Sequence, residues 1–112
     1  MPRITVSTTI PAGQSLSGVI DLAVGTANFL HMPPLWTPAL LTFQLSPDGV
    51  TFSDFVDLKT TEIAFNVLPA TSVRLPPEWI SAASGYLKLR SGTAKRPIIQ
   101  TADRLLVVSG WS

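Results

Sequence analysis

Leu41-Thr42-Phe43-Gln44-Leu45-Ser46-Pro47-Asp48-Gly49 is the stretch that decides the fold of this chain. Apolar and polar residues alternate from Leu41 to Ser46, which predicts a β-strand with one buried face and one polar face. Pro47-Asp48-Gly49 favours a tight turn, because glycine adopts positive φ freely and aspartate hydrogen-bonds its own backbone. Residues 50–58 then return as the partner strand, and the change of phase between Phe52 and Phe55 indicates a β-bulge. We therefore expect a β-hairpin here.

The same period of two recurs on both sides of the hairpin. The further predicted strands are residues 4–10, 16–22, 28–32, 62–67, 72–75, 86–90 and 104–108. Within 86–90, Leu87 and Leu89 should point into the core, while Lys88 and Arg90 should point outward. Residues 104–108 are apolar on both faces, so we expect that strand in the middle of a sheet.

Short strands separated by turns predict an all-β fold, an antiparallel β-sandwich similar to a jelly roll, with about eight strands. The run 76–83 opens with two prolines followed by Glu78, which favours one short helical turn. The 112 residues fit a single domain, residues 1–112. Residues 1–10 could in addition serve as a strand-like arm that adds to a neighbouring sheet.

The composition is poor in charge for its apolar content. Only 13% of the residues are charged and 46% are hydrophobic, whereas soluble domains average about 25% charged residues. Either the surface is unusually apolar or other chains cover much of it, and we adopt the second interpretation. Assembly is then expected rather than catalysis.

Net charge, cysteine content and hydropathy narrow the function further. The net charge is +1 and the basic residues are scattered, so we expect no nucleic-acid partner. The chain has no cysteine, which excludes disulfides and thiolate sites and fits a reducing cytoplasm. No secretory signal and no apolar run long enough to span a bilayer is visible, so we expect no membrane partner.

Few residues form a pattern that indicates a catalytic or metal-binding site. His31 is the only histidine, and without a nucleophile elbow or a paired acid–base group a core or interface role is favoured. Asp48, Asp54 and Asp57 lack the spacing of an EF-hand loop, which favours a turn aspartate and two solvated strand residues over a calcium site. Asp54, Asp57 and Glu62 can be nominated as a glycosidase pair, but nothing marks them as such. We assign no catalytic residue, no metal ligand and no cofactor.

The tryptophans allow three interpretations. Trp36 lies in a proline-bracketed loop, Trp79 lies in the proline-led turn, and Trp111 is near the end of the chain. Each can pack in the core, contact another subunit, or, for Trp36 and Trp79, stack against a sugar. With Ile4 and Val6 of the first strand, these three tryptophans form the predicted protein interface.

Several segments together are similar to a known group of proteins. They are Ser15-Leu16-Ser17-Gly18-Val19-Ile20-Asp21-Leu22, His31-Met32-Pro33 before Trp36-Thr37, Leu41-Thr42-Phe43-Gln44 before Asp48-Gly49-Val50-Thr51-Phe52, Tyr86-Leu87-Lys88-Leu89-Arg90-Ser91-Gly92-Thr93, and Pro97-Ile98-Ile99-Gln100 before Ala102-Asp103-Arg104. The chain resembles small structural proteins of tailed bacteriophages and prophages, over nearly its whole length and through hydrophobic pattern and turns. The resemblance implies a β-sandwich virion component and brings no catalytic residues.

Among virion components, the short globular chain favours a capsid cement or head-decoration protein over a fibre, neck or tail piece. We expect a homo-oligomer, with a trimer preferred, bound to the major capsid protein or other virion proteins on the head surface after synthesis in the host cytoplasm. The alternative is a carbohydrate-binding β-sandwich module for host attachment, with Trp36 and Trp79 stacking on the glycan. A small hydrolase is the third hypothesis.

Overall fold

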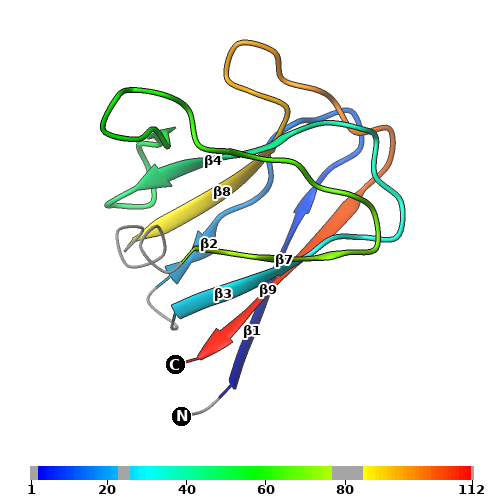
Figure 1. The fold of residues 1–112 in the computed structure, drawn as a ribbon, viewed down its shortest axis with the longest axis horizontal. Helices are drawn as coiled ribbons and strands as arrows, with labels where there is room; N and C mark the ends of the chain where they lie inside the picture. Colours follow the sequence, from blue (N-terminus) through cyan, green and yellow to red (C-terminus); the bar gives the residue numbers. More distant parts are fainter. Residues whose placement is uncertain (1–2, 23–25, 77–84, 112) are drawn as a thin grey trace.

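The structure, a computed structural model, describes residues 3–22, 26–76 and 85–111 (Figure 1). In these residues the chain forms two antiparallel β-sheets that pack face to face, and no helix. This confirms the predicted all-β sandwich. The predicted helical turn at 76–83 lies almost entirely outside the described residues.

Sheet A contains four strands in the order β1-β9-β3-β7. Their bounds are β1 Arg3–Ile10, β9 Arg104–Trp111, β3 Thr26–His31 and β7 Ser72–Arg74. The first and last strands pair without interruption, from Arg3 opposite Trp111 to Ile10 opposite Arg104. The segment that the sequence marked as an arm is therefore an edge strand of the protein's own sheet. Its β-branched residues suit that pairing.

Sheet B contains five strands in the order β2-β8-β4-β5, with β6 also paired to β4. Their bounds are β2 Ile20–Asp21, β8 Tyr86–Ser91, β4 Leu41–Ser46, β5 Ser53–Asp54 and β6 Ala64–Phe65. From β1 to β4 the chain crosses to the other sheet at every step, and it does so again from β7 to β9. This crossing pattern, with β1 beside β9, is that of a jelly roll.

The core lies between the two sheets. Fully buried side chains from both layers meet there, and they include Ile10, Leu30, Leu41, Leu89 and Leu106. Leu87 and Leu89 point inward as predicted, and β9 is a central strand as predicted. Alternate residues of each long strand thus supply the core, as a period of two requires.

The predicted hairpin is present, but its second strand is shorter than expected. Gln44 pairs with Asp54 and Leu45 with Ser53, so β5 has two residues rather than the predicted nine. Asp48 Oδ1 accepts hydrogen bonds from the N–H groups of Val50 and Thr51, at 2.8 and 3.0 Å. These donors stabilise the carboxylate and lower the pKa of Asp48 to about 2. They also hold the N–H groups of Val50 and Thr51 in the turn, so these residues do not pair with β4. The pairing of β4 with β5 has no register shift, so the predicted bulge is not present there.

Two other predicted strands are also mostly replaced by loops. The 16–22 segment contributes a single bridge from Leu16 to Arg90 and the two-residue β2. The 62–67 segment contributes a bridge from Glu62 to Val56 and the two-residue β6. Apolar and polar residues thus alternate in these segments, although only two residues of each segment form a strand.

Candidate interaction surface on the outer face of sheet A

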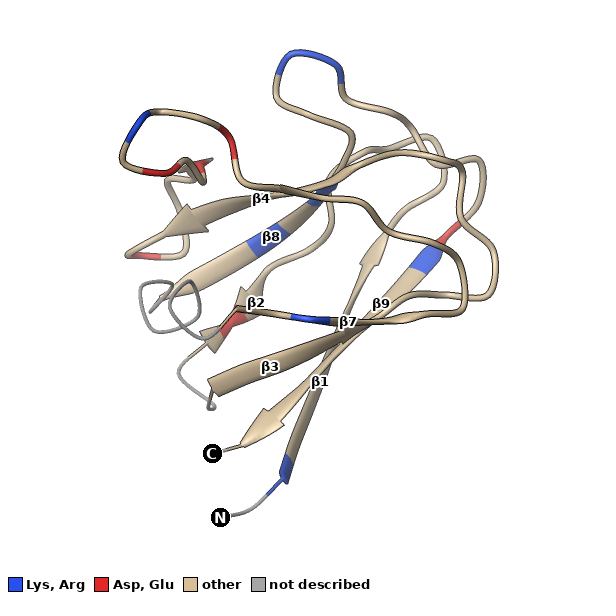
Figure 2. Cartoon of the chain, viewed as in Figure 1, with Lys and Arg blue, Asp and Glu red and all other residues tan. Residues whose placement is uncertain are grey.

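The two sheets differ in what lies over their outer faces. The long excursion between β4 and β6 includes β5 at the edge of sheet B and brings most of the acidic residues of the chain with it (Figure 2). Lys88 Nζ lies 4.5 Å from the centroid of the Phe52 ring, a cation–π contact between β8 and this excursion. Part of the outer face of sheet B is therefore covered from within the chain.

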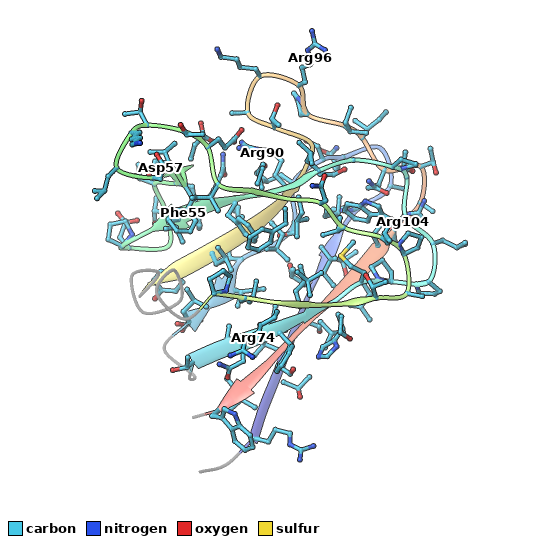
Figure 3. All side chains as sticks on the ribbon, viewed as in Figure 1. Phe55, Asp57, Arg74, Arg90, Arg96 and Arg104 are labelled. Atoms are coloured by element: carbon cyan, nitrogen blue, oxygen red, sulfur yellow. The ribbon has the colours of Figure 1, made fainter. Side chains whose placement is uncertain are left out.

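Arg90 is the centre of this covering (Figure 3). The sequence predicted that it points outward, and its exposed fraction is nevertheless only 7%. Its guanidinium forms ion pairs with Asp54, at 2.9 Å, and with Glu62. Arg90 Nε also donates to Thr42 Oγ1 at 3.0 Å. The direction was right, but the excursion buries the side chain, and paired carboxylates offset the cost of that burial.

The outer face of sheet A has no such cover from the described residues. We call this surface the sheet A face; it consists of alternate residues of four strands. They are Arg3, Thr5, Ser7 and Thr9 of β1, Leu105, Val107, Ser109 and Trp111 of β9, Phe29 and His31 of β3, and Ser72 and Arg74 of β7. It includes no Asp or Glu, and its two arginines lie at its margins. Leu105 is 53% and Phe29 41% exposed. Phe29 lies opposite Ser109 and His31 opposite Val107, so the middle of the face combines apolar and polar side chains.

His31 lies within this face and connects three strands. Its Nδ1 is 2.9 Å from Ser72 Oγ on β7 and its Nε2 is 2.8 Å from Ser109 Oγ on β9. A catalytic serine–histidine pair needs a group that orients the ring and donors for an oxyanion. Here both ring nitrogens contact serine hydroxyls, and the sheet A face contributes no carboxylate that could orient the ring. The arrangement acts as a cross-strand link.

One end of the sheet A face is hollowed into a shallow pocket of about 230 Å³, lined by Arg3, Asn28, Phe29, Ser109, Gly110 and Trp111. A register shift between Ala27 and Phe29 makes Asn28 the extra residue of a β-bulge. Asn28 Oδ1 is buried without a hydrogen-bond partner. The Arg3 guanidinium lies 6.0 Å from the Trp111 ring centroid. The pocket thus combines two aromatic rings, a cation and a free acceptor.

The predicted interface residues lie in different parts of the molecule. Trp111 lies on the sheet A face and is 46% exposed. Ile4 and Val6 point toward the other sheet from the edge strand and are half-buried. Trp79 is outside the described residues.

Trp36 belongs to the core, the first of the three interpretations, because its exposed fraction is 7%. Thr37 exchanges two hydrogen bonds with the buried Gln100, at 2.9 and 3.1 Å. Trp36 Nε1 donates to the Ala39 carbonyl at 3.3 Å. The loop is held so that this ring packs inward, which leaves it unsuited to stacking on a sugar or contacting a subunit.

The structure brings two of the nominated carboxylates together on one arginine and places the other two in separate turns. Asp48 caps the hairpin turn, while Asp54 and Glu62 pair with Arg90. Asp57 accepts from the N–H groups of Lys59 and Thr61 in its own turn, so it is not a strand residue as predicted. No group of three or more potential metal-binding side chains occurs in the described residues. That part of the chain also contains no helix long and apolar enough to cross a membrane.

Comparison of the chain with protein-family models, with curated proteins and with solved structures gives no match. The sheet A face and its pocket therefore have to be interpreted from their own geometry.

Sequence reasoning missed Phe29, Leu105 and Asn28 as surface residues. Successive residues of a strand point to opposite faces, so Leu105 and Leu106 must lie on different sides of the sheet. This signal was sufficient to predict an apolar side chain on the outer face. Asn28 gave no signal, because a β-bulge depends on the register of two strands far apart in the sequence.

Proposed function

We propose that this protein is a non-enzymatic structural protein of a tailed-bacteriophage virion, a cement or decoration protein that assembles on the capsid. The observation that carries the proposal is the sheet A face, which leaves Leu105, Phe29 and Trp111 exposed, while the chain itself covers part of its other sheet. Exposed apolar patches of this kind mark interaction sites in soluble proteins.

Two further features support the proposal. The resemblance to small phage structural proteins runs through segments on both sheets. Jelly rolls also occur in viral capsid domains, although the same architecture serves lectins, so the fold alone does not decide the function. Protein interfaces are depleted in charged residues at their core and have a polar rim, and a broad face with charges only at its margins fits that pattern.

The test uses particles of the phage or prophage that encodes this chain, imaged by electron microscopy with and without the protein. We expect a surface density that disappears when the gene is deleted and returns when purified protein is added. Leu105→Lys should bind these particles at least tenfold more weakly, because burial of one leucine contributes about 1.5–3 kcal/mol and about 1.4 kcal/mol is a factor of ten.

Leu58→Lys is the matched control, because Leu58 is a fully exposed leucine on the excursion over sheet B. It should bind like the wild type. Virions that contain no copy of the protein, or equal binding of Leu105→Lys and Leu58→Lys, would contradict the proposal.

A carbohydrate-binding module for host attachment is the second candidate, and the pocket beside Trp111 favours it. Aromatic rings stack on the C–H faces of sugars, and Phe29 and Trp111 both line this pocket. Arg3 would add a donor at the rim. This version moves the binding residues from Trp36, which is buried, to Trp111 and Phe29.

Glycan retention should then be lost in Trp111→Ala while the melting temperature stays within a few degrees of wild type, because Trp111 is half exposed. A glycan array checks retention, and Leu58→Ala serves as the control. An array on which the wild type retains nothing removes this candidate.

A further inference from the structure

The outer edge of β1 presents backbone groups that no other strand of the described residues uses. Gly18 N–H donates to the Thr9 carbonyl at 3.2 Å, which shows that Thr9 directs its backbone groups away from β9. Because this direction alternates along an antiparallel strand, Arg3, Thr5 and Ser7 also direct theirs to the outer edge. The segment at Gly18 covers only the Thr8–Thr9 end, where Thr8 Oγ1 also donates to the Gly18 carbonyl at 2.9 Å.

This edge carries few of the features that keep strand edges apart: Arg3 is the one charged residue of 3–10, and the segment at Gly18 covers one end. Proteins usually protect an edge with proline, lysine, a bulge or an inward-pointing charge. Residues 3–10 contain no proline and no lysine, and their pairing with β9 continues without a register shift. The side chains directed inward near the free end are Ile4 and Val6, both only half-buried.

We propose that two copies of this chain pair through β1, antiparallel, about a two-fold axis at Thr5. The proposal deepens the proposed function and rests on it for its biological setting, because it names a second copy as one partner of the assembly. In this register Ile4 lies opposite the Val6 of the other copy, and Arg3 lies opposite Ser7.

The edge complements itself in three respects. Arg3, Thr5 and Ser7 direct their backbone groups to the outer edge, and each lies opposite a residue of the other copy that does the same. Arg3 lies opposite Ser7, and Thr5 lies opposite Thr5. The half-buried Ile4 and Val6 cover each other, which removes apolar surface from water. The arginines of the two copies face serines rather than each other, so no like charges meet.

The pairing also has a consequence for the sheet A face. Two four-stranded sheets become one eight-stranded sheet, and both faces lie on the same side of it. The pocket at the end of the sheet A face sits close to the axis in both copies, because Arg3 belongs to the pocket and to the paired strand. The arrangement is a dimer, in contrast to the trimer preferred from the sequence.

Thr5→Pro is the first test, with sedimentation velocity of the full chain over a wide range of concentration. Proline is tolerated on an edge strand where its nitrogen faces outward, so the ladder to β9 is kept while pairing between copies is blocked. We expect the wild type to sediment as a dimer at high concentration and Thr5→Pro as a monomer. Val107→Thr, a mild change on the neighbouring strand of the same face, should sediment like the wild type.

Cysteine cross-linking tests the register without relying on proline. The chain has no cysteine of its own, so Thr5→Cys introduces the only thiol. Opposed residues of an antiparallel pair have Cα atoms about 5.5 Å apart, which lies within disulfide range. Air oxidation with a copper catalyst should therefore link most of the Thr5→Cys chains into covalent dimers.

Ser7→Cys is the matched control on the same strand and face. Its two copies would be offset by four residues, about 13 Å along the strands, too far for a disulfide. A wild type that stays monomeric, or equal cross-linking of Thr5→Cys and Ser7→Cys, overturns the β1 pairing. Neither result affects the particle-binding test, so failure of the pairing and failure of the virion proposal are distinguishable.

Discussion

Gly110→Ala should destabilise the protein by about 3 kcal/mol or more, a cost at the upper end of that for overpacking. A Cβ atom at position 110 would overlap the Thr26 carbonyl oxygen and lie 2.8 Å from the Thr26 carbonyl carbon. Both are backbone atoms, so β3 would have to move away from β9 at the bulge. Urea unfolding followed by circular dichroism measures the effect.

Gly13→Ala is the control for this prediction. Gly13 has φ of +78° and open space around its would-be Cβ, so alanine there adds only conformational strain, about 1 kcal/mol. Gly110 is not among the residues with positive φ, and its requirement is for space alone. If Gly110→Ala were as stable as Gly13→Ala, the close approach of β3 and β9 would be wrong, and with it the shape of the pocket.

Arg90→Gln should cost about 3 kcal/mol, since removal of one member of a buried ion pair leaves the other charge uncompensated. The magnitude is at the low end of the usual range, because the Asp54 side chain is 42% exposed and can regain water. The Glu62 side chain, at 20% exposure, is the more costly one to leave alone. The melting temperature should fall by roughly 10 °C.

Two further variants test whether this loss of stability comes from the ion pairs of Arg90. Arg74→Gln, an exposed arginine on the other layer (Figure 3), should change the stability by no more than about 0.5 kcal/mol. Combining Arg90→Gln with Glu62→Gln should recover part of the loss, because the unpaired carboxylate is then gone. Equal unfolding midpoints for Arg90→Gln and Arg74→Gln would show that the ion pairs do not hold the excursion on sheet B.

Local sequence signals predicted the parts of the fold that depend on neighbours along the chain. The alternation of Leu41 to Ser46 and the turn at Asp48 located the hairpin, because strand and turn lie within a few residues of each other. The apolar run at 104–108 likewise predicted a central strand. None of these local signals predicts that β1 pairs with β9, because these strands lie at the two ends of the described chain.

Arg90 and Trp36 show why the candidate site was harder to predict than the fold. A period of two says which way a side chain points, but it does not say what covers that face. Arg90 points away from the core and is buried by the excursion, while Leu105 points away from the core and is exposed. The loop that carries Trp36 is held by Gln100, which hydrogen-bonds the neighbouring Thr37 from more than sixty positions away. Surfaces for binding depend on such long-range contacts.

The position of β9 between β1 and β3 also determines when sheet A can form during synthesis. On the ribosome β1 emerges first, and its neighbour in the sheet emerges only after nearly all other strands have left the exit tunnel. Closing so long a stretch of chain is entropically slow. Until Arg104–Trp111 is released, β1 and β3 lack the strand that joins them, so the nascent chain passes through a period in which it needs protection from aggregation.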